Sequence, residues 1–599
     1  MFQAIIKYWP LLLGLIAGLI LVPFNILGFN FNYLPGDLGD GRFNNYILEH
    51  NFQYLIGNIE SYWNAPFMFP VKQVICYSDN LMGSSPFYII FRFLNFDREF
   101  SYQAWLLVIC ILNYFSCYIF LWEWTKNKYA AVLGAFIFAF SIALQSQVTH
   151  TQVFPRFCIP LSFLMLLLFI KKFHVKYFFG LLFFCVWQFY CAIYIGLLLS
   201  IPLIISTFIV FIKYNKKLLE LFHNSRWRNQ MLFSLLANFT MLFLLMYPYI
   251  NSVEKTSELI NYQTVINSVP TISSHFFSQP GSLFWDFLGS HLKELPAYWD
   301  HQIFAGTIAS VSLMIFFCTF YIPHYFKALN LAELRIFAIT GMLCFLLFLR
   351  IGNYSLYYFI YLIPGFSAMK SLTRVINVEL LFFGMAVSYT FMMLTRLKQI
   401  KQSILFLSVF GLIILDNFFK SDSVYKIEKA EAQSRTNALI NKLEGIPPNE
   451  IVSYEPEELH SASIHYNLDA MLACQQKQLK CVNAYTGNSP HFYSSFWHEP
   501  NTKNRLYFFS KMNFTPEKVY IVKDLQAFLI ENTKTVMKSS DSFNKPTIID
   551  SMAISKMVDK IKLDPGWFEH VQKKAKEKNI SLDSMLTLDA IWVLTNENK

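Results

Sequence analysis

The hydrophobic positions of the chain gather in long apolar runs that short polar segments separate. A helix needs about 20 predominantly apolar residues to cross a bilayer. Eleven runs approach or reach that length, at residues 10–29, 102–122, 129–147, 153–170, 177–194, 195–212, 230–250, 302–323, 336–350, 376–395 and 403–420. The pattern predicts a polytopic α-helical membrane protein with about eleven transmembrane helices.

The continuous stretch 177–212 is far too long for one crossing. The lysines that flank it are Lys171, Lys172, Lys176, Lys213, Lys216 and Lys217. Because lysine and arginine favour the cytoplasmic side of a membrane, both ends of the stretch are expected there. We therefore predict that it crosses twice, with a turn near residues 190–196.

With this choice, the charges of the short connections agree with one topology. The connections predicted to be cytoplasmic each carry lysine or arginine, and they are 123–128, 171–176, 213–229, 324–335 and 396–402. The segments predicted to lie outside are 30–101, 251–301, 351–375 and everything after 420. The first apolar run lacks a clear cleavage site, so it is interpreted as a signal anchor. We expect a multi-pass protein of a bacterial inner (plasma) membrane, with its N-terminus in the cytoplasm.

After residue 420 the chain becomes charged and mixed. Short β-like runs alternate with helical stretches such as 566–578, and the β-like runs are 449–454, 480–485, 518–522 and 546–550. This alternation predicts a transmembrane domain over 1–420 and an extracytoplasmic α/β domain over 421–599. The polar turn Tyr485–Pro490 follows the second β-like run and is expected to point toward the membrane site.

Composition agrees with a membrane protein, since hydrophobic residues make up 55% of the chain and charged residues only 15%. The net charge of +10 does not indicate nucleic acid, because much of it lies in the short loops that orient the protein. Most of the 10 cysteines lie in apolar segments and are interpreted as small core residues. Cys474 and Cys481 share a polar region, and the sequence leaves a disulfide between them open.

The strongest candidate for chemistry is the glycine-rich turn directly after the first apolar run. Asp37 and Asp40 lie on it, among three glycines that leave the carboxylates uncrowded. Arg42 follows and can hold a carboxylate ionised or bind an anion. From Phe43 the pattern predicts an amphipathic helix that lies flat on the membrane. An acidic N-cap for that helix is the alternative interpretation of the aspartates.

Further polar residues are predicted on the same outer side. Asp79 precedes an amphipathic run and is a candidate for positioning substrate or for an N-cap. His150 and Arg156 lie in a tight turn between two membrane helices, where an arginine can also snorkel to the surface. Lys370 and Arg374 are cations on the outer side, against the usual charge distribution, which favours an anion such as a lipid phosphate or simple headgroup contact.

The outer loop 251–301 combines aromatic, acidic and histidine side chains, which are His275, Trp285, Asp286, His291, Trp299, Asp300 and His301. Rings and carboxylates together are typical of a sugar-binding surface, but tryptophans also anchor proteins at the membrane interface. The histidines lack the spacing of a zinc site. Both interpretations of this loop stay open.

The layout and the motif Gly39-Asp40-Gly41-Arg42-Phe43 resemble the GT-C superfamily of integral membrane glycosyltransferases. The resemblance implies transfer of a hexose or pentose from a polyprenyl-phosphate carrier to a hydroxyl of a lipid-linked glycan or a protein, on the outer face of the membrane. It implies Asp40 as the base, with Asp37 assisting or replacing it, because the family's second acidic residue is absent at Gly41. The second outer loop lacks a clear metal-binding acidic pair, so a reaction without a cofactor is favoured and a divalent metal stays possible.

The chemistry of such a reaction needs a base for the acceptor hydroxyl and a cation for the departing phosphate. The candidates for the donor phosphate or substrate are Arg42, Asp79, His150, Arg156, Lys370 and Arg374. The expected partners are the lipid-linked donor, the glycan or protein acceptor and membrane lipids, with no nucleic acid. The rival interpretations are a transporter or flippase, a polymerase or ligase of lipid-linked polysaccharide, and a membrane scaffold without enzymatic activity.

Overall fold

The computed structural model describes residues 2–253, 261–288, 295, 297–318, 330–397, 401–456, 462–524, 529–531, 551–577, 582, 585–587 and 589–590. The chain comprises two compact units, Met1–Glu531 and Asn532–Lys599. The first unit contains the membrane helices and most of the predicted α/β domain. The boundary predicted at residue 420 falls within this unit, between the apolar helices and the mixed helices and strands that follow. That this position divides two domains stays a prediction.

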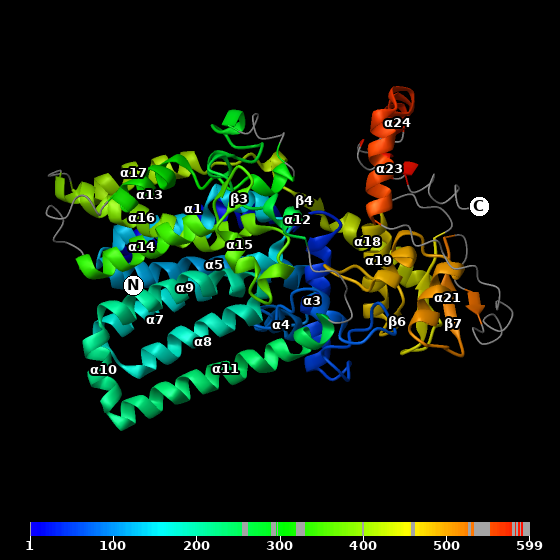
Figure 1. The fold of residues 1–599 in the computed structure, drawn as a ribbon, viewed down its shortest axis with the longest axis horizontal. Helices are drawn as coiled ribbons and strands as arrows, with labels where there is room; N and C mark the ends of the chain where they lie inside the picture. The colour runs from blue at the N-terminus through cyan, green and yellow to red at the C-terminus, as the bar shows by residue number, and fades with distance from the viewer. Residues whose placement is uncertain are drawn as a thin grey trace. The chain divides into compact units, whose positions relative to one another are not determined.

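Long apolar helices dominate the first unit (Figure 1). Seven of them, within the described residues, are long and apolar enough to span a membrane: Tyr8–Leu27, Arg98–Thr125, Lys128–Gln147, Thr151–Lys172, Ile193–Lys213, Ser225–Ser252 and Leu372–Arg396. Three shorter apolar helices are Val175–Cys191, Thr307–Phe317 and Gln402–Asp416. The predicted fold class, a polytopic helical membrane protein with further structure at its C-terminal end, is confirmed.

Each of the eleven apolar runs overlaps a helix. The helices are α1 (Phe2–Leu21) with α2 (Pro23–Leu27), α5 (Arg98–Thr125), α6 (Lys128–Phe140), α7 (Cys158–Lys172), α8 (Val175–Cys191), α9 (Ile193–Lys213), α11 (Ser225–Val253), α13 (Thr307–Phe317), α14 (Leu331–Leu347), α16 (Ile376–Leu397) and α17 (Gln402–Asp416). Short elements between them include α10 (Asn215–His223), α12 (Tyr262–Ile266), α15 (Tyr357–Tyr361) and the hairpin of β2 (Arg350–Ile351) and β3 (Tyr354–Ser355).

Close packing of α6 against α16 shows how small residues hold the bundle together. A Cβ atom on Gly134 would lie 2.3 Å from the carbonyl oxygen of Gly384, so only glycine allows the two backbones to approach this closely. The Ser388 hydroxyl donates a hydrogen bond of 2.8 Å to the carbonyl of Ala130 across the same contact. Apolar surface gives little driving force inside a membrane, which makes such contacts important for association.

The stretch 177–212 forms two helices, as predicted. Helix α8 ends at Cys191, α9 begins at Ile193, and Ala192 between them has extended backbone angles. A Cβ on Gly196 would lie 2.6 Å from the ring of Phe189, which places the two helix ends against each other. The predicted turn is therefore confirmed as the link of a helical hairpin, while the double crossing of the membrane stays a prediction.

The first outer loop contains β1 (Tyr33–Pro35), α3 (Asp40–Leu55), the 3-10 helix η1 (Val74–Tyr77) and α4 (Pro86–Phe93). The helix predicted after the glycine-rich turn is confirmed, and its position flat on the membrane stays a prediction. Residues 41–52 of α3 are all buried, because protein surrounds this part of the helix on every side. Several of its buried polar groups are paired within the protein, as where Glu49 accepts hydrogen bonds from Tyr88 and Arg92.

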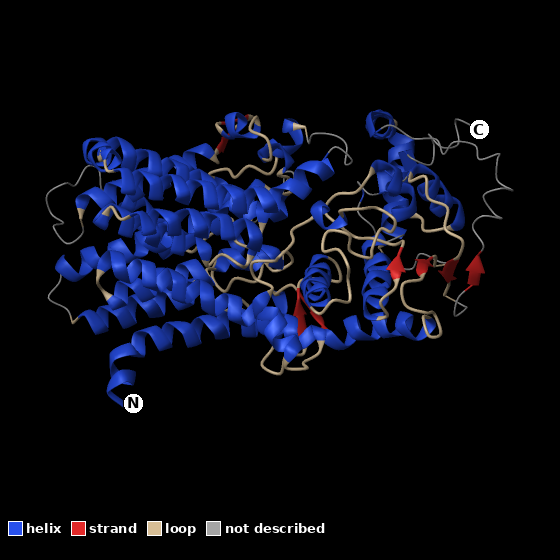
Figure 2. Ribbon diagram, turned by 90° about the horizontal axis from the view of Figure 1, so that it is seen from below, coloured by secondary structure: helices blue, strands red, loops and turns tan. Residues whose placement is uncertain are grey.

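A small α/β layer follows α17. It comprises β4 (Lys426–Glu428), α18 (Lys429–Lys442), β5 (Ile451–Tyr454), α19 (Ser463–Gln476), β6 (Lys480–Cys481), α20 (Ser494–His498), α21 (Thr502–Lys511), β7 (Val519–Val522) and β8 (Leu529–Glu531). The sheet has the order β6-β5-β7-β8, with β5 parallel to β6 and β7, and β8 antiparallel to β7. Figure 2 draws the strands in red. The β-like runs 449–454 and 518–522 are thus confirmed as strands, and 480–485 contains the short strand β6, while 546–550 lies outside the described residues.

The α/β layer is joined directly to the first outer loop. Strand β1 pairs antiparallel with β4, with Tyr33 opposite Glu428. The backbone of 66–69 also bonds to 481–483, since the Phe69 N–H donates to the carbonyl of Cys481 at 2.9 Å. These contacts explain why residues up to 531 form one compact unit with the membrane helices.

Loops that are predicted to lie on the same side of the membrane contact one another in the structure. At one end, segments predicted to be cytoplasmic meet, as where Lys171 bonds to Glu123 at 3.1 Å and Asn127 to Gln402 at 3.2 Å. At the other end, 30–101 meets the chain after 420 through the β1–β4 pair. The assignment of either end to a cellular compartment stays a prediction.

The second unit is a small helical assembly. Helices α23 (Ser551–Leu563) and α24 (Pro565–Glu577) carry most of its described structure. Its core residues are Met557, Ile561, Val571, Met585, Leu586 and Ala590. The helix predicted at 566–578 corresponds to α24.

Candidate active site

The glycine-rich turn places Asp40 at the first position of α3. Gly36 has a positive φ of 82°, which glycine adopts without strain. A Cβ on Gly41 would lie 2.2 Å from the carbonyl oxygen of Pro35, so the close turn requires glycine there. The Asp37 carboxylate accepts the Gly39 N–H at 2.8 Å and is otherwise exposed. Asp37 therefore stabilises the turn that presents Asp40.

Two side chains from distant parts of the chain bind the Asp40 carboxylate. Nδ1 of His150 lies 2.6 Å from Oδ2, and the Tyr485 hydroxyl donates to Oδ1. The Asp40 side chain keeps 24% of its surface exposed and that of His150 28%, so the pair remains accessible. Asp40 caps no helix, because the N-cap position of α3 is Gly39 and no side chain caps it. The interpretation of Asp40 as an N-cap is wrong.

The surroundings of Asp40 favour its ionised form. Burial raises the pKa of Asp40, but the hydrogen bond and charge of His150 and the hydroxyl of Tyr485 oppose that effect. The positive charge of Arg374 acts in the same direction, and the net result is a pKa below the ordinary value. Burial and the neighbouring Asp40 charge raise the pKa of Tyr485, so its hydroxyl keeps its proton and donates it.

The turn that carries His150 is held firmly. Nδ2 of Asn44 donates to Oγ1 of Thr151 at 3.0 Å and to Oε1 of Gln152 at 2.7 Å. The Tyr102 hydroxyl lies 2.6 Å from the same Thr151 hydroxyl. Because Asn44 belongs to α3, one helix positions both Asp40 and its histidine partner.

The turn Tyr485–Pro490 lies at this site, as predicted from its place after a strand. Besides the Tyr485 contact with Asp40, the Lys370 ammonium donates to the carbonyl of Gly487 at 3.0 Å and to Oδ1 of Asn488 at 3.1 Å. The α/β layer thus contributes side chains to a site that the sequence assigns mainly to membrane loops. The sequence predicted that this turn lies near the site, but it did not identify Tyr485 as the residue that binds Asp40.

Arg374 is a cation without an ion pair among the described residues. Its guanidinium carbon lies 5.0 Å from the ring centre of Tyr194, at the start of α9. Its Nε atom is buried and has no hydrogen-bond partner within the described part of the chain. The charge of Arg374 lowers the pKa of both Asp40 and Asp79, which places it near both carboxylates. A cation in this state is suited to bind an anionic ligand.

Asp79 has a structural contact that the sequence did not indicate. Its Oδ1 accepts the N–H of Ile193 at 2.7 Å, at the N-terminus of α9. Burial raises the pKa of Asp79, and the hydrogen bonds from the helix backbone and the charge of Arg374 oppose the rise. Asp79 therefore caps a helix, as one interpretation expected, but the helix is a distant one whose first turn carries Tyr194.

Arg42 and Arg156 are not brought to Asp40 by any contact of the described structure. Arg42 is buried and forms an ion pair of 2.6 Å with Asp469, which joins α3 to α19. Arg156 is 0% exposed, which contradicts the expectation that it snorkels to the surface, and its guanidinium lies 5.0 Å from the ring of Phe138. Both arginines, which the sequence suggested as ligands of the donor phosphate, are thus buried inside the protein.

The residues of the loop 251–301 mostly hold elements together. His275 pairs with Glu379 of α16 at 3.1 Å, and the indole of Trp285 donates to Oδ1 of Asp416 at 3.0 Å. Asp416 also accepts the N–H of Ile308 at 3.0 Å and so caps α13. Trp299 is exposed, and His291 lies outside the described residues.

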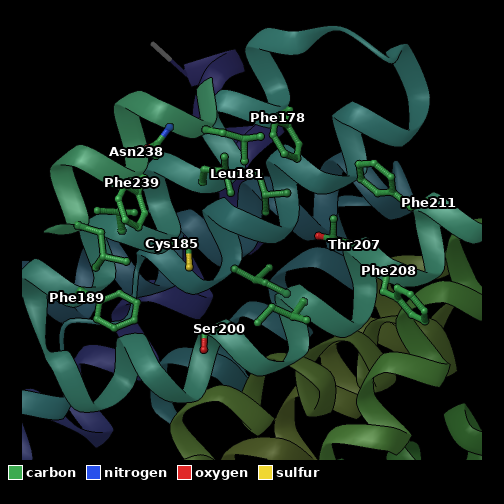
Figure 3. A pocket seen from close by; sticks show the side chains of 16 residues that line it. Phe178, Leu181, Cys185, Phe189, Ser200, Thr207, Phe208, Phe211, Asn238 and Phe239 are labelled. Atoms are coloured by element: carbon green, nitrogen blue, oxygen red, sulfur yellow. The ribbon is translucent and has the colours of Figure 1, made fainter. Parts of the chain in front are cut away.

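An apolar groove lies on the membrane helices α8, α9 and α11 (Figure 3). Its volume is about 650 Å³. Its lining residues are Phe178, Leu181, Leu182, Cys185, Val186, Phe189, Ser200, Leu203, Ile204, Thr207, Phe208, Phe211, Leu235, Asn238, Phe239 and Leu242. Such a lining suits the hydrocarbon chain of a lipid.

The described residues contain no group of three or more histidine, cysteine, aspartate or glutamate side chains arranged to hold a metal ion. The nearest neighbours of the Asp40 carboxylate are an imidazole and a phenol that both bind it directly.

Neither a protein-family model nor a curated protein matches the chain. Among solved structures, the chain is similar to the archaeal oligosaccharyltransferase AglB from Archaeoglobus fulgidus, in complex with an inhibitory peptide and a dolichol-phosphate. The TM-score is 0.46 at 13% sequence identity, over 87% of this chain and 70% of the other. A similarity of this degree carries no argument about the chemistry of the present chain.

Proposed function

We propose that the protein is a membrane glycosyltransferase that moves a sugar from a polyprenyl-phosphate carrier to a hydroxyl of a lipid-linked glycan or a protein. The proposal rests on one observation: the accessible Asp40–His150 pair lies near the cation Arg374. Arg374 forms no ion pair within the described residues. A base and a free cation at one end of a membrane bundle are what such a transfer requires.

The reaction exchanges one bond at the anomeric carbon of the sugar. The bond from this carbon to the phosphate oxygen breaks, and its electron pair stays on the phosphate. The acceptor oxygen forms the new bond as it loses its proton to the base. The negative charge of Asp40 favours that loss, and Arg374 stabilises the charge that develops on the departing phosphate.

The groove on α9 supports a lipid-borne donor. Tyr194, against which Arg374 lies, belongs to the first turn of α9, and later turns of the same helix line the groove from Ser200 onward. Its volume of about 650 Å³ and its apolar lining suit part of a hydrocarbon chain. A phosphate near Arg374 with an isoprenoid chain in the membrane fits this arrangement, and Lys370 lies on the segment that leads to Arg374.

The proposed reaction needs no resident metal or cofactor. The donor already carries a good leaving group, and Arg374 supplies the positive charge that a metal would otherwise bring. Each oxygen of Asp40 already accepts a hydrogen bond from a protein side chain, His150 on Oδ2 and Tyr485 on Oδ1.

Purified protein in liposomes tests the proposal. The donors are radiolabelled hexoses and pentoses on polyprenyl phosphate, supplied one at a time. The acceptors come from membranes of a strain that lacks this protein. Transfer of label from the donor to a lipid-linked glycan or a protein is the expected result. Movement of an intact lipid-linked glycan across the liposome membrane, without transfer, would instead indicate a flippase.

A further inference from the structure

The hydrogen bonds of Asp40 have a consequence for the path of the proton. We propose that Nε2 of His150, and not the carboxylate of Asp40, accepts the proton of the acceptor hydroxyl, and that Asp40 positions the imidazole. This inference rests on the proposed glycosyl transfer and assigns a role within it. It differs from the assignment made from the sequence, in which Asp40 is the base and His150 a candidate ligand of the donor phosphate.

The direction of the hydrogen bond follows from the state of Asp40. An ionised carboxylate offers only acceptors, so Nδ1 of His150 must donate across the 2.6 Å contact. In the neutral imidazole the proton on Nδ1 leaves a lone pair on Nε2. Nε2 has no hydrogen-bond partner among the described residues, and the side chain is 28% exposed, so the lone pair is accessible to a substrate.

Asp40 is a weak base in these surroundings. Its carboxylate accepts hydrogen bonds on both oxygens, one from His150 and one from Tyr485. Bonds that stabilise the ionised form reduce the tendency of a carboxylate to take up a proton. The same negative charge stabilises an imidazolium ion on His150, which is how a carboxylate assists a histidine base.

The imidazole is also held in place before a substrate binds. Asn44 bonds to both residues that follow His150, and Tyr102 bonds to the first of them. A fixed base avoids the entropy loss of orienting it during the reaction. Among the described contacts of His150, none reaches Arg374, so base and cation remain separate groups for the two ends of the transfer.

The step balances without any further reactant. The hydroxyl O–H bond breaks, its proton moves to Nε2, and its oxygen bonds to the anomeric carbon as the bond to phosphate breaks. The phosphate leaves with the electron pair, and the imidazolium then releases its proton to water. No group is oxidised or reduced.

The test compares His150→Gln, Asp40→Asn, the double variant and the control His223→Gln, an exposed histidine at the end of α10. Glutamine retains an N–H that can donate to Asp40, so the fold is expected to persist. We expect His150→Gln to lower kcat by roughly 10²–10⁴-fold without raising the donor KM, as the loss of a general base does. The double variant should lose about as much as either single variant, because the two residues act as one unit.

A second measurement covers a possible folding defect. In His150→Ala, added imidazole should restore part of the activity, which a purely structural role of His150 would not allow. Near-normal kcat in His150→Gln together with an inactive Asp40→Asn would overturn the inference and make Asp40 the base. A rise in donor KM alone would make His150 a phosphate ligand. Absence of transfer by the unaltered protein would instead reject the proposed function itself.

Discussion

Substitution of Asp40 by asparagine removes one negative charge while keeping the size of the side chain. Asp40 caps no helix, so the substitution removes no N-cap at the start of α3. Asparagine offers one oxygen acceptor, and it can therefore accept from only one of the two groups, His150 and Tyr485, that bind the carboxylate. The substitution tests the charge of the site with little change of shape.

The substitution is expected to affect both the rate of transfer and the stability of the protein. Without the charge of Asp40, His150 loses the group that positions and stabilises it as the base, so kcat should fall as it does when general-base catalysis is lost, by roughly 10²–10⁴-fold. This corresponds to about 3–5 kcal/mol at 1.36 kcal/mol per tenfold change. Hydrogen bonds to a charged group contribute about 1.5–3 kcal/mol and neutral ones about 0.5–1.5 kcal/mol. One weakened bond and one lost bond therefore lower the free energy of unfolding by about 3 kcal/mol. Transfer should fall by orders of magnitude while the variant still folds.

The sign of the pH dependence follows from the lowered pKa of Asp40. A carboxyl group whose pKa is lower in the folded state stabilises the protein above its unfolded value, here 3.8. That contribution is lost as the pH falls from this value through the lower folded pKa. The unaltered protein should thus lose more stability than Asp40→Asn over that acidic range, measured by thermal unfolding.

The assay is label transfer by purified variants in liposomes, with Asp37→Asn as the matched control. Asparagine at position 37 can still accept the Gly39 N–H, so we expect a smaller loss there. Near-normal transfer by Asp40→Asn together with an inactive Asp37→Asn would move the essential carboxylate to Asp37. Full activity of both variants would refute a carboxylate mechanism at this turn.

Four further outcomes are expected. Arg374→Gln should raise the donor KM and lower kcat, because the departing phosphate loses its cation, and unchanged kinetics would exclude Arg374 from the site. Arg42→Met should leave kcat intact in the folded protein but lower the free energy of unfolding by about 3 kcal/mol, because it breaks the buried pair with Asp469; a specific loss of kcat would contradict this. Cys474 and Cys481 are free and buried in the structure, so both should be alkylated after denaturation without reductant, and a linked peptide pair in mass spectrometry would show a disulfide. A chelator of divalent metals should leave transfer unchanged, and recovery only after added metal would disprove the metal-independent reaction.

Several features of this fold follow from local sequence. Membrane helices depend on runs of apolar residues, and the lysines around 177–212 were enough to predict that this run turns between α8 and α9. Strands β5 and β7 follow from short apolar segments between helices. The glycines around Asp40 encode a tight turn, since a side chain at Gly41 would collide with Pro35. Each of these signals lies within a few residues of the element that it specifies.

The partners of the candidate site residues depend on packing between distant segments. Asp40 and Tyr485 are separated by 445 positions, and no periodicity of the sequence relates them. Arg42 and Arg374 are both cations near predicted outer loops, yet one pairs with Asp469 and the other has no ion pair among the described residues. Helix α3 is buried for the same reason, because the α/β layer packs against a face that an amphipathic pattern would assign to solvent. The sequence alone determines the elements and the turn that presents Asp40, whereas the tertiary structure decides which side chains meet there, because each pairing depends on how segments remote in the chain pack together.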